Sequence, residues 1–173
     1  MDLRFVEPHL SKLDEIDAEI LIASVFADVR PARGVLGLCD FRLGGRLSRL
    51  MKQGFITGAF GEVVLVPGKP RLTFDKVLVF GAGARAHLDE AAYVGLVGKM
   101  LMTLEGLAAR TAVVELPGRQ ANAIGAARAV DVLLTETGGS KLHDVWTLVE
   151  DAEGRASIEQ HMVEQKRRVR RLF

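Results

Sequence analysis

EVVLVPGKPRLTFDKVLVFGAG, at residues 62–83, contains two short apolar segments, 62–66 and 76–80, separated by a turn region rich in proline and glycine. Short valine-rich runs bounded by glycine and proline are typical of β-strands. The connection between Val66 and Val77 is too short for the crossover that joins parallel strands. The stretch therefore predicts an antiparallel pair of strands.

Strand and helix patterns alternate on both sides of this stretch. Apolar runs of strand length predict four further strands, at residues 3–6, 18–26, 111–116 and 145–149. Helical spacing predicts helices at residues 38–53, 89–105 and 122–135, and a closing helix that starts after Gly154. With one antiparallel pair, this alternation indicates a three-layer α/β fold with a mixed central sheet and helices on both faces.

Two local features refine the helix predictions. Asp89 precedes the second helix and is expected to cap its N-terminus. Gly44 and Gly45 fall inside the helix predicted at 38–53, where each glycine costs roughly 1 kcal/mol relative to alanine. Close packing of a neighbouring segment is the expected reason for the pair.

The composition describes an ordinary folded domain of 173 residues, with 49% hydrophobic and 26% charged residues. We expect a single domain over residues 1–173. Cys39 is the only cysteine, so an intrachain disulfide is excluded and a reducing cytoplasm is expected. The N-terminus lacks a signal-peptide pattern, and the longest apolar stretch, 20–27, is far shorter than the roughly 20 residues of a membrane span.

Four blocks carry a family resemblance: IASVF at 22–26, GFITGAFGEVVLV at 54–66, KVLVFGAG at 76–83 and LDE at 88–90. Their order and spacing resemble the amino-terminal domain of the leucyl aminopeptidase, or cytosol aminopeptidase, family from about residue 17 to 104. The resemblance implies a macro-domain-like fold. It also implies that the residues of the two-metal peptidase reaction are absent, because in the family they lie on a separate carboxy-terminal domain.

We therefore expect a stand-alone, non-catalytic binding or assembly module without a metal or cofactor. Family members are hexamers in which this domain helps contacts between subunits, so the resemblance implies a homo-oligomer or another protein partner. An ADP-ribose or nucleotide binder is the second hypothesis, and a nucleic-acid-associated regulator is the third. No membrane partner is expected.

Two segments echo the catalytic motifs of the family. DAEGR at 151–155 matches part of one metal-binding motif, and GKPRLTFD at 68–75 resembles another with one residue displaced. The other metal ligands have no counterpart in the chain. We interpret both echoes as coincidence, which makes a metalloaminopeptidase the last of the hypotheses.

Related macro domains bind ADP-ribose at the sheet edge where the strands ending near Ala27 and Phe80 stop. This comparison predicts a ligand site made by Ser24, Arg33, Gly34, Gly81, Gly83 and Arg85. The N–H groups of the glycines either cradle a phosphate or form a tight turn that needs small residues, and the turn is favoured. The loop at 28–34 lacks the asparagines of the macro-domain loop, which argues against ADP-ribose hydrolysis.

Two basic segments are candidates for phosphate contacts. The first is a stripe on the helix predicted at 38–53, made by Arg42, Arg46 and Arg49. The second is the C-terminal tail, which contains Lys166, Arg167, Arg168, Arg170 and Arg171. Cations near a helix C-terminus are also favoured by the helix dipole, by about 0.3–1 kcal/mol each. No aromatic residues are interleaved for base stacking, so a solvated helix face is the favoured interpretation.

Overall fold

The computed structural model describes residues 2–121, 123–137 and 145–171. Its centre is a six-stranded sheet with the order β1-β6-β5-β2-β4-β3. The strands are β1 (Asp2–Val6), β2 (Ile20–Val25), β3 (Val63–Pro67), β4 (Lys76–Gly81), β5 (Thr111–Val114) and β6 (Val145–Val149). β3 runs antiparallel to β4 with Val66 opposite Val77, and the other neighbours are parallel. The predicted antiparallel pair and mixed sheet are confirmed.

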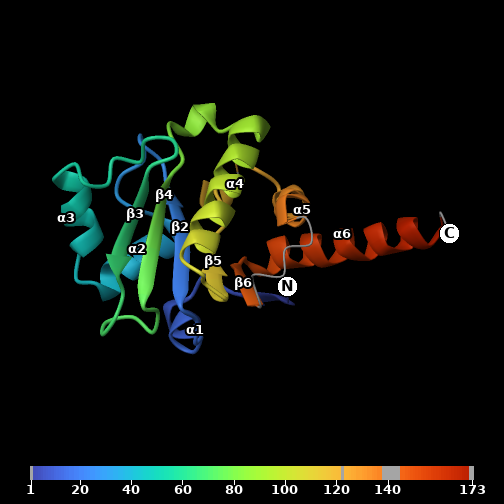
Figure 1. Ribbon diagram of the computed structural model, residues 1–173, viewed down its shortest axis with the longest axis horizontal. Coiled ribbons are helices and arrows are strands. Elements are labelled where there is room, and N and C mark those ends of the chain that lie inside the picture. The colour runs from blue at the N-terminus through green and yellow to red at the C-terminus, as the bar shows by residue number, and fades with distance from the viewer. Residues whose placement is uncertain (1, 122, 138–144, 172–173) are drawn as a thin grey trace.

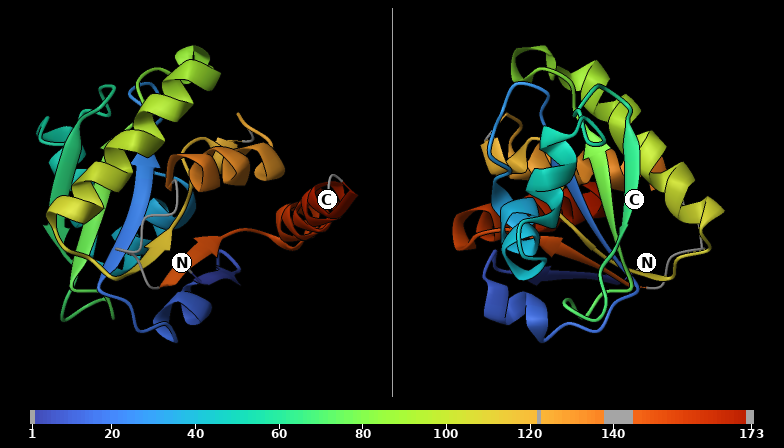
Figure 2. Two further views of the ribbon diagram at one scale, coloured as in Figure 1. Left: turned by 45° about the vertical axis from the view of Figure 1, so that its right-hand side comes forward. Right: turned by 90° about the vertical axis from the view of Figure 1, so that its left-hand side faces the viewer.

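Helices cover both faces of the sheet (Figures 1 and 2). They are α1 (Leu10–Asp14), α2 (Gly34–Arg42), α3 (Arg46–Lys52), α4 (Glu90–Gly106), α5 (Ala126–Thr137) and α6 (Ala152–Arg171), with 3-10 turns η1 (Arg85–His87) and η2 (Arg119–Ala121). α4, α5 and the start of α6 lie on one face, and α1, α2 and α3 on the other. The three predicted layers are thus present.

β2 shows why the sheet is buried on both faces. Its side chains alternate, so that Ile20 and Ile22 pack in one core and Leu21 and Ala23 pack in the other. All six of its residues are buried, as expected for a strand in the interior of a parallel sheet. No helix in the described part of the chain is long and apolar enough to cross a membrane.

The single helix predicted at 38–53 is wrong, because two helices occupy this region. Gly44 and Gly45 adopt φ values of 62° and 75°, a left-handed conformation that ends α2. Asp40 then caps α3, since its Oδ1 accepts hydrogen bonds from the N–H groups of Leu47 and Ser48 at 2.8 and 3.1 Å. The glycines therefore make a turn between helices.

The expected N-terminal cap of α4 is confirmed, whereas the predicted start of the last helix is wrong. Asp89 Oδ1 accepts from Ala92 N–H at 2.8 Å. α6 begins at Ala152 and includes Gly154, whose N–H donates to Asp151 Oδ1 at 2.7 Å. Gly154 is needed inside the helix because an added Cβ would lie 2.3 Å from Glu150 Oε2. Here glycine permits a close contact instead of ending a helix.

Candidate functional site

The parallel strands end at one edge of the sheet, which we call the carboxyl edge. Two neighbouring cavities open along it. The Arg85 cavity, of about 220 Å³, is lined by Ser24, Val25, Phe26, Val29, Ala32, Arg33, Arg85 and Ala121. The acidic cavity, of about 250 Å³, is lined by Pro8, Gly34, Glu115, Arg119, Val149, Glu150 and Asp151. Ligands of open α/β sheets characteristically bind at such an edge.

The residues predicted to bind a ligand are brought together only in part. Ser24, Arg33 and Arg85 line the Arg85 cavity, and Gly34 lines the acidic cavity. Gly81 and Gly83 are not among the lining residues of either cavity. The N–H of Gly81 donates to Glu62 O at 2.8 Å, and the N–H of Gly83 donates to Gly58 O at 2.9 Å. These two donors are therefore engaged within the fold.

The glycines of this region allow loops to pack closely. A Cβ on Gly81 would lie 1.9 Å from the carbonyl oxygen of Ala59. Gly58 has a φ of +79°, and a Cβ there would lie 2.8 Å from the backbone of Phe26 and Ala27. The glycine-rich block at 54–61 thus holds the loop before β3 against the ends of β2 and β4.

Two arginines organise the loops around the Arg85 cavity. The backbone N–H of Arg85 donates to Asp28 Oδ1 at 3.0 Å, and its Nη2 donates to Ala121 O at 2.9 Å. Arg30 Nη1 donates to Phe26 O at 2.6 Å, and its Nη2 donates to Thr57 O at 2.8 Å. Arg30 was not a predicted site residue, because a sequence does not reveal contacts with distant carbonyl groups.

The acidic cavity contains a buried ion pair that sequence reasoning missed. Arg119 follows β5 and Glu150 follows β6, and their side chains are 11% and 3% exposed. Arg119 Nε and Nη2 donate to Glu150 Oε1 and Oε2 at 2.7 and 2.9 Å. Arg119 Nη1 donates to Ile124 O at 2.7 Å. One guanidinium group therefore ties the β5–α5 connection to the end of β6.

Glu115 is the second missed residue, and it caps α2 from the end of β5. Its Oε1 accepts from the Val35 N–H at 3.0 Å, whereas its Oε2 is buried without a hydrogen-bond partner among the described residues. Burial raises the pKa of Glu115 to about 7, the Val35 N–H opposes this rise, and nearby Glu150 adds to it. The one signal in the sequence is a carboxylate directly after a buried strand.

Cys39 lies in an environment that does not favour a reactive thiol. The residue is 1% exposed, and burial raises the pKa of the Cys39 thiol to about 12, with a smaller contribution from Glu115. A thiol that stays protonated at neutral pH is a poor nucleophile.

The basic stripe predicted at 42–49 is divided by the break between the helices. Arg42, on α2, forms an ion pair with Asp14, and Arg49, on α3, donates through Nη1 to Gly44 O at 2.9 Å. Arg46 is exposed on α3. The basic residues predicted at 166–171 lie in α6, but their side chains fall outside the described part of the structure.

The two segments that echo catalytic motifs lie at opposite edges of the sheet. Lys69 pairs with Asp75 at 2.7 Å in the β3–β4 turn, where β4 begins, whereas Asp151 follows the end of β6 and caps α6. Within the described residues, no group of three His, Cys, Asp or Glu side chains could hold a metal ion. The echoes do not form one site.

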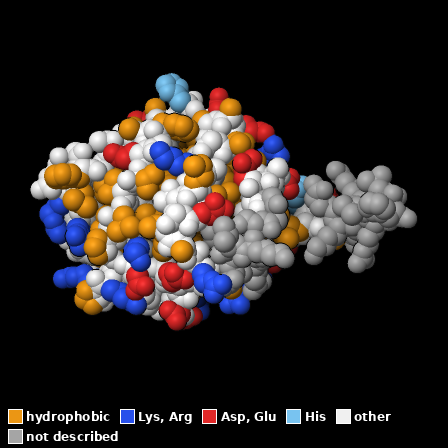
Figure 3. All heavy atoms as spheres, viewed as in Figure 1, with side chains coloured by type: hydrophobic (Ala, Val, Ile, Leu, Met, Phe, Trp, Pro, Cys, Tyr) orange, Lys and Arg blue, Asp and Glu red, His pale blue; other side chains and the backbone are white. Residues whose placement is uncertain are grey.

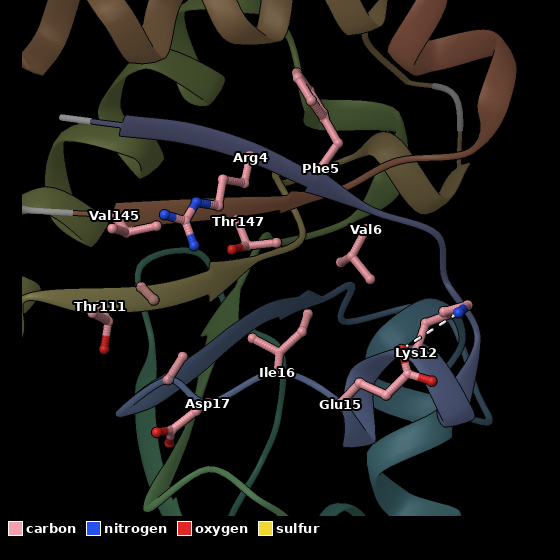
Figure 4. A pocket seen from close by; sticks show the side chains of 12 residues that line it. Arg4, Phe5, Val6, Lys12, Glu15, Ile16, Asp17, Thr111, Val145 and Thr147 are labelled. Atoms are coloured by element: carbon pink, nitrogen blue, oxygen red, sulfur yellow. Dashed lines mark hydrogen bonds and ion pairs between the residues drawn. The ribbon is translucent and has the colours of Figure 1, made fainter.

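A larger cavity, of about 540 Å³, lies away from the carboxyl edge. Figure 4 shows it between β1, β6 and the segment that leads into β2, with Arg4 extending alongside Thr147. Lys12 Nζ donates to Glu15 Oε2 at 3.4 Å on its rim. Its lining contains no fully buried charged side chain, so we place the candidate site at the carboxyl edge.

The strand order and the cavities at the carboxyl edge define a macrodomain-like α/β protein, and solved structures support this class. The Trypanosoma brucei macrodomain in complex with ADP superposes with a TM-score of 0.70 at 15% sequence identity, covering 92% of this chain and 67% of that one. A tomato leucine aminopeptidase mutant superposes with a TM-score of 0.61 at 15% identity, covering 94% of this chain and 35% of that one. At these identities the likeness establishes the fold alone.

Sequence comparison assigns the family. The N-terminal domain of the cytosol aminopeptidase family matches residues 25–136, and the chain therefore belongs to this family. The cytosol aminopeptidase of Pseudomonas aeruginosa PAO1 is 35% identical over 89 residues, which are 49% of this chain and 18% of that protein. The chain thus spans a small part of the relatives that it matches, and the match does not cover their catalytic domain.

Proposed function

We propose that this chain is a non-catalytic assembly module in which two copies pair through the outer edge of β3. The single observation that carries the proposal is the absence of charge on this edge. β3 ends the sheet, and its sequence, Val-Val-Leu-Val-Pro, contains no charged residue. Monomeric proteins protect such edges with lysine, inward-pointing charges, bulges or covering segments. Pro67 protects one end of this strand, and a bulge at Gly61 and Glu62, which both bond Gly81, precedes the other end; Val63 to Val66 lie between them.

The hydrogen-bonding groups on this edge face outward. Glu62 O accepts from Gly81 N–H at 2.8 Å, so alternation along the antiparallel pair directs Val64 and Val66 toward β4. Val63 and Leu65 then direct their N–H and C=O groups away from the sheet. Among the described residues, no hydrogen bond outside the β3–β4 ladder involves Val63 or Leu65.

The side chains beside the edge are apolar. Leu65 is 45% exposed and Phe60, in the loop before β3, is 55% exposed. Figure 3 shows hydrophobic side chains gathered over β3 and the loop that precedes it. Burying them adds a non-directional gain of about 25 cal/mol per Å² to the directional pairing of the strands.

A symmetric pairing follows from this geometry. An antiparallel contact centred on Val64 places Val63 opposite Leu65 of the partner subunit, and Leu65 opposite Val63 of the partner subunit. Both are then hydrogen-bonded pairs, because the outward groups of Val63 and Leu65 meet their counterparts. A two-fold axis closes the assembly at a dimer through this surface.

A nucleotide ligand is the second candidate, and Arg33 and Arg85 beside the Arg85 cavity favour it. Two observations argue against it. The Val35 N–H at the start of α2 already donates to Glu115, and the N–H groups of Gly81 and Gly83 already donate to backbone carbonyl groups. We therefore expect ADP-ribose to cause a small or absent thermal shift.

Sedimentation velocity tests the assembly proposal. We expect the wild type to form dimers whose fraction rises over roughly a hundredfold range of protein concentration. Leu65→Lys places a charge on the edge and should give monomers with an unchanged far-UV circular dichroism spectrum. The matched control is Leu134→Lys on α5, because Leu134 is 39% exposed and lies far from β3; it should remain dimeric. A wild type that stays monomeric throughout would contradict the proposal.

A further inference from the structure

The acidic cavity has the chemistry of a cation site, independently of the β3 edge. We propose that it binds a small primary ammonium ligand, in which an –NH₃⁺ group carries a short alkyl chain. The ammonium group would lie against Glu115 and Asp151, and the alkyl chain against Pro8 and Val149.

The polar groups of the cavity are mainly acceptors. All three guanidinium nitrogens of Arg119 donate within the protein, to Glu150 and to Ile124 O. The N–H groups of Val35 and Gly154 donate to Glu115 and Asp151. The side chains of the cavity therefore offer a ligand carboxylate oxygen, which requires a donor.

Glu115 carries a buried acceptor that has no hydrogen-bond partner among the described residues. It lines the cavity, is 4% exposed, and has one carboxyl oxygen without a partner among the described residues. Leaving a buried polar atom unsatisfied costs about 1–3 kcal/mol, more when it is charged. An N–H donor in the cavity would satisfy Oε2 while Oε1 continues to cap α2.

The charge in the cavity also favours a cation. Three carboxyl groups, those of Glu115, Glu150 and Asp151, face the single guanidinium group of Arg119. The N-termini of α2 and α6 together add roughly one positive charge, which is about half of the carboxylate excess. The cavity therefore remains negative when Glu115 is ionised, and an anion would be repelled.

The state of Glu115 couples ligand binding to pH. The charged groups that line the cavity with it are Arg119, Glu150 and Asp151. The titratable thiol of Cys39, on α2, also interacts with Glu115. Because the Glu115 pKa is about 7, ionisation and hence affinity should increase from pH 6 to pH 8. An alkylammonium group, with a pKa near that of lysine at about 10.4, stays charged over this range.

The test titrates the protein with n-butylammonium chloride and follows the Val35 amide by heteronuclear NMR. We expect saturable shifts with tighter binding at pH 8 than at pH 6. Two probes separate the parts of the ligand: 1-butanol has a donor without charge, and tetramethylammonium has charge without an N–H. Both should bind at least about tenfold more weakly. Inorganic phosphate should leave the Val35 signal unchanged.

Variants connect the binding to the named residues. Glu115→Gln keeps an oxygen for the Val35 N–H and should weaken n-butylammonium at least about tenfold and abolish its pH dependence. Asp151→Asn keeps the cap of α6 and should also weaken binding. The control, Glu105→Gln at the far end of α4, should bind as the wild type does. Absent saturation, equal binding by 1-butanol, unchanged affinity in both site variants, or a phosphate response at Val35 would each overturn the proposal.

Discussion

Arg119 and Glu150, which are 31 positions apart, form a two-pronged ion pair with distances of 2.7 and 2.9 Å at the ends of β5 and β6. Both side chains are almost fully buried, and the pair forms one wall of the acidic cavity. The pair therefore serves the fold and the candidate site together.

Removing one member of this pair should be strongly destabilising. Arg119→Ala leaves Glu150 buried without a partner, and we expect a loss of about 3–5 kcal/mol in the free energy of unfolding, measured with urea. Lys12→Ala breaks the exposed Lys12–Glu15 pair at α1 and should cost at most about 0.5 kcal/mol. Similar losses in the two variants would refute the importance of the buried pair.

Glu115 should make the stability depend on pH. The pKa of its carboxyl is raised from 4.5 to about 7 in the folded state, so the folded protein binds the proton more tightly. This contribution is full below pH 4.5 and is lost as the pH rises through 7. Glu115→Gln should therefore match the wild type near pH 4.5 and exceed its stability at pH 8, by up to about 3 kcal/mol. Urea unfolding at both values checks this, and a constant difference would count against it.

Two glycine substitutions should have opposite effects. Gly81→Ala places a Cβ 1.9 Å from Ala59 O, so we expect a loss of about 1–3 kcal/mol in thermal or urea unfolding. Gly95→Ala, on the exposed side of α4 with no atom within 4 Å of the new Cβ, should gain about 0.5–1 kcal/mol. A tolerated Gly81→Ala would show that the loop before β3 packs less closely than described.

The chain should not hydrolyse leucyl-anilide substrates with added Zn²⁺, Mn²⁺ or Mg²⁺. The physical reason is the separation of Lys69 and Asp151 to opposite edges of the sheet, together with the absence of a metal-binding group among the described residues. A chromogenic assay tests this. Turnover that disappears in Asp151→Ala would establish a metallopeptidase site after all.

Local patterns predicted much of the fold, because the deciding contacts are close in sequence. The separation of Val66 from Val77 was enough for the antiparallel pair, and Asp89 was enough for the start of α4. The break at Gly44 and Gly45 was missed because the apolar spacing continues across it. What ends α2 is the left-handed backbone, followed by the new cap from Asp40.

Only those residues of the candidate site that lie at or just after the ends of predicted strands could be predicted from the sequence. Ser24 lies at the end of β2 and Arg85 follows the neighbouring strand β4, so their convergence could be expected. Glu115 and Val35 are 80 positions apart, and the sequence does not state that one caps the other. The sequence likewise does not predict that the N–H groups of Gly81 and Gly83 donate hydrogen bonds within the fold, since their acceptors lie in another loop.

The pairing of two copies through β3 is tested most directly by amide hydrogen exchange at low and high protein concentration. The account predicts that the amides of Val63 and Leu65 exchange more slowly at high concentration, because they become hydrogen-bonded to the partner subunit. The same amides in Leu65→Lys should exchange at a rate independent of concentration. Wild-type Val63 and Leu65 amides that exchange equally fast at both concentrations would contradict the account.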